Sequence, residues 1–191
     1  MNNVVRTKAF PTLIYEIDCS ELVGEVRKLL SETNFIGPNS FVSDSFYVLN
    51  DQLKLKFEEK VNSAISELEY QIPFKVSTSW FTRTEPNKTI HKHRHTNCYW
   101  SGSFYFYDDC APLLITKEKP QIFVPFGSCN PELMMSGTIQ MRADCGKLIL
   151  FPSHMEHYVS ENESDRDRYS LAMNFMPHGV TRWYDSEYNY Q

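Results

Sequence analysis

Several features that would place this chain in a specialised class are absent from its sequence. The 191 residues carry a formal net charge of −5, and no stretch concentrates lysine and arginine, which disfavours a nucleic-acid partner. No apolar run approaches the length of a membrane span, and the first residues lack the apolar segment of a secretion signal. The sequence also contains no internal repeat and no low-complexity tract. We therefore expect a soluble, cytoplasmic protein without a membrane partner.

The cysteines argue against a zinc site or a disulfide framework. There are 5 of them, an odd number, and none forms a C-x-x-C pair. Zinc sites and thioredoxin-like motifs need closely spaced thiols, and secreted disulfide frameworks usually need an even count. Free thiols in a reducing compartment are expected at Cys19, Cys98, Cys110, Cys129 and Cys145.

The length favours one domain. A chain of 191 residues is large enough for one substantial core and short for two, and 41% hydrophobic residues are typical of a packed globular protein. We predict a single domain over 1–191. It consists of a preface of helices and strands (1–72), a β-rich core (73–178) and a tail (179–191) that is expected to be loosely packed.

The preface contains two candidate helices. A strand is predicted over 10–17, and a helix then runs from a cap at 18–20 to a stop before Gly37-Pro38. A short extended piece follows over 41–49. Asn50 or Asp51 caps the second helix, whose apolar residues recur every three or four positions at Leu53, Phe57, Val61, Ile65 and Leu68. These helices are expected to buttress a sheet.

From residue 73 onward, short β segments alternate with turn residues. Strands are predicted over 74–83, 89–96, 100–107, 113–116, 121–124, 138–142, 147–151, 157–159 and 169–176, with a loop over 125–136. Many short strands at close spacing are typical of a sandwich or barrel, and two curled antiparallel sheets make a jelly roll. The fold class is therefore α+β and mainly β.

A histidine cluster is the strongest functional signal. Alternate residues of a strand point to one side, so His91, His93 and His95 can present imidazoles to one face. A further ligand from a separate strand, here His157, is how proteins hold a redox-active iron with open positions. Arg168 opens the strand after His157, and we expect the two on neighbouring strands of a single sheet. A basic side chain there favours an anionic co-substrate.

Three sequence blocks resemble one known family. They are His93 to Tyr105 with its alternate histidines and Ser101-Gly102, Gly146 to His157 with Phe151-Pro152-Ser153, and Arg168-x-Ser170 with Asn174. Their order, with Trp80 ahead of them, resembles the iron(II)/2-oxoglutarate-dependent oxygenases, in particular small oxygenases of bacteria and phages. The resemblance covers about residues 80–175.

The resemblance implies a double-stranded β-helix, a jelly roll that binds Fe(II) in one mouth, here buttressed by the N-terminal helices. It implies that His93 and His157 are metal ligands and that Arg168 and Ser170 bind the distal carboxylate of the co-substrate 2-oxoglutarate. The strand holding Tyr105 and Tyr107 could also offer a hydroxyl to that co-substrate. The implied reaction consumes O2 and oxidises a C–H bond, most simply by hydroxylation, with release of succinate and CO2. Arg166 is the fallback for Arg168.

One position departs from the superfamily's commonest site, which has two histidines and one carboxylate. Here the second position is His95, which we favour as the third ligand. The alternatives are a carboxylate from Glu156, Asp108 or Asp109. His91 is expected to be a surface residue or to support a ligand.

Two other functions stay open on sequence alone. One is a cupin-like three-histidine dioxygenase that does not use 2-oxoglutarate, although the usual glutamate is missing after the histidine pair. The other is a non-catalytic jelly-roll assembly module, against which Arg168-x-Ser170 argues because an abandoned site need not keep a carboxylate clamp. The prime substrate has no readable signature, and the sequence leaves a homodimer open.

Overall fold

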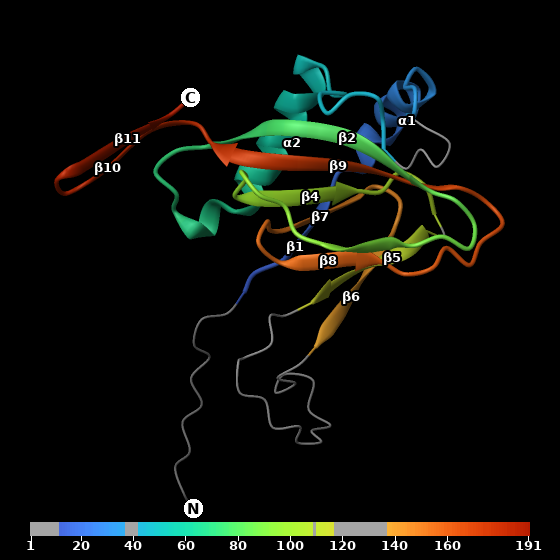
Figure 1. Ribbon diagram of the computed structural model, residues 1–191. Coiled ribbons are helices and arrows are strands. Elements are labelled where there is room, and N and C mark those ends of the chain that lie inside the picture. The colour runs from blue at the N-terminus through green and yellow to red at the C-terminus, as the bar shows by residue number, and fades with distance from the viewer. Residues whose placement is uncertain (1–11, 37–41, 109, 117–136) are drawn as a thin grey trace, which may run out of the picture.

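A computed structural model describes residues 12–36, 42–108, 110–116 and 137–191 (Figure 1). Its helical elements are η1 (Ser20–Leu22), α1 (Val23–Ser31), α2 (Asp51–Ala64) and η2 (Ser66–Leu68). Its strands are β1 (Tyr15–Asp18), β2 (Phe74–Thr84), β3 (Ile90–His93), β4 (Trp100–Phe104), β5 (Cys110–Thr116), β6 (Thr138–Ala143), β7 (Lys147–Pro152), β8 (Glu156–Val159), β9 (Arg168–Pro177), β10 (Gly179–Trp183) and β11 (Ser186–Tyr190).

Two antiparallel sheets form the body of the molecule. One has five strands in the order β1-β7-β4-β9-β2, and the other has four in the order β3-β8-β5-β6. The chain alternates between the sheets: β3, β5, β6 and β8 lie in the second, whereas β4, β7 and β9 lie in the first. This arrangement confirms the jelly roll predicted from the sequence.

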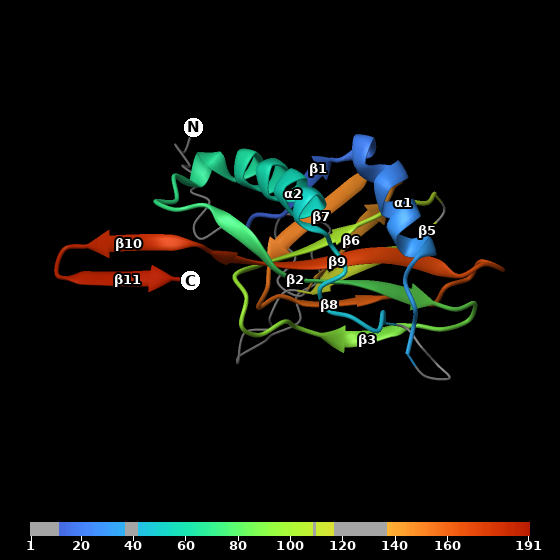
Figure 2. The same cartoon turned by 90° about the horizontal axis from the view of Figure 1, so that it is seen from above.

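Both predicted helices lie over the outer face of the five-stranded sheet (Figures 1 and 2). Asn50 caps α2, because its side chain accepts a hydrogen bond from the Leu53 backbone N–H at 2.9 Å. Four residues of the predicted stripe are buried (Leu53, Phe57, Val61 and Ile65), and Leu68 is partly buried. The Phe57 ring contacts Phe104 of β4, with centroids 5.3 Å apart. Burying each such side chain contributes about 1.5–3 kcal/mol, so the helices and sheet stabilise each other.

The strand β7 carries a continuous run of apolar residues because both of its faces are buried. Leu148 and Leu150 belong to the core beneath the helices, whereas Ile149 and Phe151 belong to the core between the sheets. A strand covered on both faces has no polar side to present. Beside it, Gly102 of β4 is closely packed, since a Cβ there would lie 3.0 Å from Leu148 Cδ1 and 3.3 Å from Phe175 Cε2.

Some predicted elements differ from the structure. The strand expected over 89–96 is the shorter β3, and the strand expected over 100–107 ends at Phe104. Residues 42–49 form only isolated bridges along the β2 edge, including Val42 to Thr82, and no strand. The strand predicted over 121–124 and the loop predicted over 125–136 lie outside the described residues.

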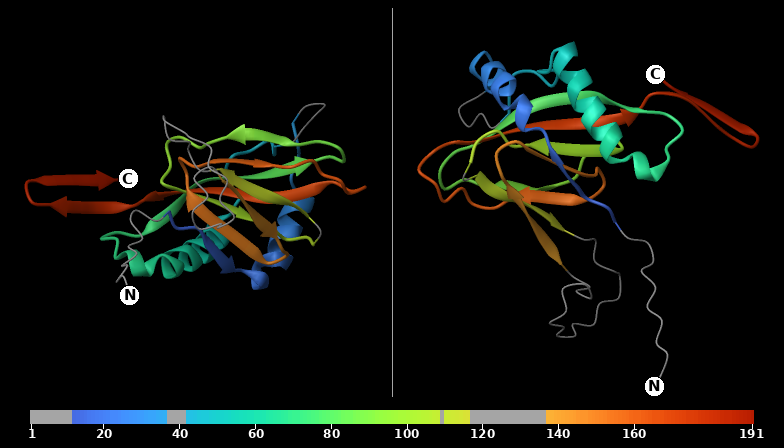
Figure 3. Two further views of the ribbon diagram at one scale, coloured as in Figure 1. Left: turned by 90° about the horizontal axis from the view of Figure 1, so that it is seen from below. Right: turned by 180° about the vertical axis from the view of Figure 1, so that it is seen from behind.

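The C-terminal tail has regular structure that was not expected, although most of its residues are exposed, which agrees with loose packing. It forms the β10–β11 hairpin, which projects beyond the two sheets (Figures 2 and 3). Two hydrogen bonds between the Gln71 side chain and the Arg182 backbone tie the end of β10, next to the turn of the hairpin, to the body. Alternating Thr, Tyr and Trp residues favour paired strands, a signal that the position at the chain end obscured.

The cysteines and the helices of the described residues can be set against the sequence predictions. Cys19, Cys98 and Cys145 are free thiols, as predicted. In the described ranges, no helix has both the length and the apolar character needed to cross a membrane.

Candidate active site

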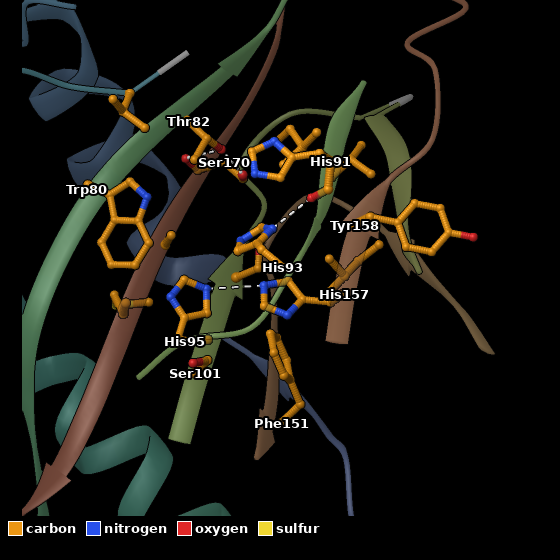
Figure 4. A pocket seen from close by; sticks show the side chains of 18 of the residues that line it. Trp80, Thr82, His91, His93, His95, Ser101, Phe151, His157, Tyr158 and Ser170 are labelled. Carbon is orange, nitrogen blue, oxygen red and sulfur yellow. Dashed lines mark hydrogen bonds between the residues drawn. The ribbon is translucent and has the colours of Figure 1, made fainter. Parts of the chain in front are cut away.

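A cavity of about 230 Å³ lies between the two sheets and gathers most of the predicted site residues (Figure 4). The four-stranded sheet and the loop after β3 supply its histidines. The five-stranded sheet supplies Trp80 and Thr82 from β2 and Arg168 and Ser170 from β9. The cavity therefore has a histidine end and an arginine end.

Three histidines meet at the first end. His93 lies directly opposite His157 in the β3–β8 pairing, and His95 joins them from the loop after β3. One ring nitrogen from each lies within 4.8 Å of the others, and the Nε2 atoms of His95 and His157 are 3.1 Å apart. The prediction that one strand carries all the alternate histidines is therefore wrong for His95, which lies beyond the strand end.

Backbone carbonyls orient two of these rings. His93 Nδ1 lies 2.8 Å from the His91 carbonyl oxygen, and His157 Nδ1 lies 3.0 Å from the Met155 carbonyl oxygen. A carbonyl only accepts, so each Nδ1 carries the proton and each Nε2 keeps a free lone pair. Metal-binding histidines characteristically have this arrangement. The rings therefore suit a divalent cation.

Burial keeps two of the rings uncharged. Together with a smaller contribution from the neighbouring imidazoles, it lowers the pKa of His95 to about 4 and that of His157 to about 3. The hydrogen bond to the Met155 carbonyl opposes this lowering at His157 without reversing it. Both rings are neutral at pH 7, and the neutral imidazole is the form that binds a metal.

No alternative carboxylate within the described residues joins the cluster. Glu156 points to the outer face of the sheet, where its oxygens lie 4.0 Å from Lys92 Nζ and 3.8 Å from Arg94 Nη2. Asp108 is exposed and lines a different cavity. Asp109 lies outside the described residues. His91 is exposed, and its ring centroid is 5.6 Å from that of His93, so its backbone carbonyl rather than its ring supports the cluster.

The second end of the cavity holds a buried guanidinium. Arg168 is 3% exposed, and its Nε donates to the Ala111 carbonyl at 3.0 Å. Its Nη2 donates to the Tyr105 hydroxyl at 3.3 Å and its Nη1 to Ser170 Oγ at 3.5 Å. No carboxylate pairs with Arg168 in the part of the chain that the structure describes. Because burying an uncompensated charge is costly, this end of the cavity is suited to an anion.

One member of this end was missed in the sequence. Thr82 Oγ1 lies 2.6 Å from Ser170 Oγ, across the β2–β9 pairing in which the two residues are direct partners. The sequence could have indicated Thr82, because it lies two residues after Trp80 and therefore on the same face of the strand. Trp80 itself lies against the histidines, with its ring centroid 5.4 Å from that of His95.

The expectation that His157 and Arg168 occupy neighbouring strands of one sheet is wrong. His157 lies on β8 of the four-stranded sheet and Arg168 on β9 of the five-stranded sheet. The polar segment 160–167 crosses from one sheet to the other instead of making a hairpin. This crossover places the histidine end and the arginine end on facing sheets.

The other residues that the sequence offered for the site do not line the cavity. Arg166 is exposed and pairs with Asp165 at 3.7 Å, outside the cavity. Tyr107 packs under the Arg27 guanidinium, 4.8 Å from its ring centroid. Asn97 is an exposed loop residue with a φ of 57°. Asn174 is buried and hydrogen-bonded to Ser101.

A sequence model of the family described as "Putative 2OG-Fe(II) oxygenase" matches residues 78–174, which is more than half of the 191 residues. The chain therefore belongs to this family of oxygenases, whose cofactor is Fe(II) and whose co-substrate is 2-oxoglutarate. A search of curated proteins found no match.

Solved structures show the same fold at low sequence identity. The α-ketoglutarate-dependent carbocyclase SnoK from nogalamycin biosynthesis has a TM-score of 0.62 and 11% identity, over 86% of this chain and 79% of SnoK. HygX from Streptomyces hygroscopicus, solved with nickel, 2-oxoglutarate and hygromycin B, scores 0.60 at 12% identity, over 91% and 86%. A prolyl-4-hydroxylase from Pseudomonas putida scores 0.55 at 14% identity, over 86% and 92%.

Proposed function

We propose that this oxygenase is a hydroxylase that oxidises a C–H bond of an organic substrate with O2 and releases succinate and CO2 from 2-oxoglutarate. One observation carries the proposal: a cluster of three imidazoles and a buried guanidinium that has no carboxylate partner among the described residues share a single cavity. This combination suits one divalent metal and one dianionic co-substrate at once.

His93, His95 and His157 are the proposed ligands. Their three nitrogens leave the remaining coordination positions of the metal open to co-substrate and oxygen. Iron bound with 2-oxoglutarate supplies the oxidising chemistry when O2 is present. The protein orients His93 and His157 through backbone carbonyls, and it keeps His95 and His157 neutral by burial.

Arg168, Ser170, Tyr105 and Thr82 are proposed to bind the far carboxylate of 2-oxoglutarate. A guanidinium can donate two parallel hydrogen bonds to a carboxylate, which an ammonium cannot do. Tyr105 and Ala111 hold the guanidinium in place, and Thr82 fixes the Ser170 hydroxyl. These contacts prearrange the arginine end before the co-substrate arrives.

The prime substrate is proposed to enter beside Trp80 and Val42, which line the cavity next to the exposed ring of His91. The structural relatives include a carbocyclase, an epimerase and a prolyl hydroxylase, so the fold alone does not select a reaction. Hydroxylation is proposed because it is the simplest outcome of the shared chemistry.

Calorimetric titration under nitrogen tests the proposal. The protein is loaded with Fe(II) and then titrated with 2-oxoglutarate, and succinate is measured after oxygen is admitted. Saturable binding of both, with slow succinate formation even without a prime substrate, is the expected result. Iron binding without any 2-oxoglutarate heat or succinate would instead favour the cupin-like dioxygenase.

A further inference from the structure

The loop that carries His95 is held at both ends by one residue. The Ser153 carbonyl accepts a hydrogen bond from the His95 N–H at 3.1 Å, and the Ser153 N–H donates to the Tyr99 carbonyl at 3.1 Å. Residues 94–96 belong to no strand, so no sheet ladder holds His95. The position of this imidazole therefore depends on where Ser153 sits.

The same turn also orients a second histidine. Ser153 and Met155 follow β7, and the Met155 carbonyl accepts from His157 Nδ1 at 3.0 Å. The Met155 N–H closes the turn on the Pro152 carbonyl at 3.0 Å. One short turn thus fixes the position of His95 and the ring orientation of His157.

A series of hydrogen bonds between buried side chains, here called the chain, anchors this turn to the sheet. Ser101 Oγ lies 2.9 Å from Ser153 Oγ and 2.9 Å from Asn174 Oδ1, and Asn174 Nδ2 donates to Thr78 Oγ1 at 3.1 Å. Ser153, Ser101 and Asn174 are at most 8% exposed. The chain therefore runs from the turn across β4 and β9 to β2.

The Ser101 hydroxyl is the centre of this chain. It is the donor in both contacts, to Ser153 Oγ and to Asn174 Oδ1, each at 2.9 Å, so both side chains depend on this one hydroxyl group. Removing the Ser101 hydroxyl would leave two buried polar groups without their partner, and the turn would lose the side-chain contact that ties Ser153 to β4.

We propose that Ser153, Ser101 and Asn174 are positioning residues that hold His95 in register with the other two proposed metal ligands. The inference rests on the proposed metal site and adds residues that do not touch the metal. A buried hydrogen-bond chain is rigid when every member is satisfied, and a ligand on an otherwise unpaired loop needs such support. Partners that orient metal ligands typically change metal affinity by 10–100-fold when mutated.

The test compares iron affinity with fold stability in Ser101→Ala and Ser153→Ala. Ser79→Ala is the matched control: Ser79 is fully buried and its hydroxyl accepts from the Leu49 N–H at 3.1 Å. Within the described residues, its side chain makes no hydrogen bond to the turn or to the histidines. Fe(II) dissociation constants are measured under nitrogen by competition with a chromophoric chelator, and melting temperatures are measured without metal.

Ser101→Ala and Ser153→Ala are expected to weaken Fe(II) binding about tenfold or more. Ser79→Ala should lose comparable thermal stability and bind Fe(II) within about twofold of wild type. If one of the two test variants fails to fold, the other decides the question.

Unchanged Fe(II) affinity in the folded test variants would overturn the proposal, because the chain would then serve the fold alone. Equal weakening in Ser79→Ala would overturn it too, since the effect would follow stability rather than His95. A wild-type protein that binds no Fe(II) would instead refute the proposed metal site itself.

Discussion

The two ends of the cavity are held in place in different ways. At the histidine end, main-chain carbonyls of His91 and Met155 orient the rings of His93 and His157. At the arginine end, one main-chain carbonyl, that of Ala111, accepts from Arg168, and the other contacts of Arg168 and Ser170 are with side-chain hydroxyls. Backbone carbonyls persist when a side chain is replaced, whereas hydroxyls do not. The histidine end should therefore lose most when a ligand itself is removed and less when a hydroxyl that positions His95 is removed, whereas the arginine end should respond to every hydroxyl.

The largest expected effect is loss of a ligand at the histidine end. His93→Ala and His157→Ala should each abolish stoichiometric Fe(II) binding, because two remaining nitrogens make an incomplete site. His91→Ala is the control and should bind Fe(II) nearly as wild type, since only its backbone carbonyl supports His93. Metal analysis after anaerobic dialysis measures all three. Tight iron in His157→Ala would contradict the assignment.

The next comparison separates a three-histidine site from one completed by a carboxylate. His95→Ala should lose tight Fe(II) binding, whereas Glu156→Ala should keep it, because Glu156 faces Lys92 and Arg94 on the outer surface. Iron titration of both variants checks this. The opposite pattern would show that a carboxylate supplies the third ligand, and the oxygenase assignment would survive.

At the arginine end, Arg168→Lys should weaken 2-oxoglutarate binding and leave Fe(II) affinity nearly intact. An ammonium cannot reproduce the two-pronged geometry, and the loss of a charge-assisted hydrogen bond costs about 1.5–3 kcal/mol. This corresponds to roughly ten- to more than a hundredfold in affinity. Calorimetry on the Fe(II)-loaded protein measures it. If Arg168→Lys binds 2-oxoglutarate as tightly as wild type, another residue must bind the carboxylate.

The smallest expected effect concerns the hydroxyls around Arg168. Ser170→Ala and Thr82→Val each remove a neutral partner, and each should weaken 2-oxoglutarate binding by about 0.5–1.5 kcal/mol. The 2.6 Å contact between Thr82 and Ser170 implies that the two effects are not additive. Titration of both single variants and the double variant tests this coupling. Full additivity would show that Thr82 does not act through Ser170.

The sequence predicted the elements whose signal is local. The apolar stripe and the Asn50 cap specify α2, and the turn residues divide the β segments close to their observed bounds. The histidine cluster was noticed because alternate residues of a strand share a face. The roles expected for Arg168 and Ser170 came from the resemblance to the 2-oxoglutarate-dependent oxygenases.

The parts that escaped prediction depend on contacts between distant segments. Local patterns cannot say which sheet a strand joins, so His157 and Arg168 were expected on neighbouring strands rather than on facing sheets. Thr82 and Ser153 look like ordinary polar residues until the β2–β9 pairing and the turn after β7 bring them to Ser170 and His95. The end of β3 before His95 likewise depends on its pairing with β8.

The most direct test of the account is an optical one. Apoprotein under nitrogen receives Fe(II) and then 2-oxoglutarate while its visible spectrum is recorded. Because the account places the co-substrate on the iron held by His93, His95 and His157, a metal-to-ligand charge-transfer band should appear only after both additions and be absent in His157→Ala. A wild-type protein that binds Fe(II) and 2-oxoglutarate but shows no such band would contradict the shared site.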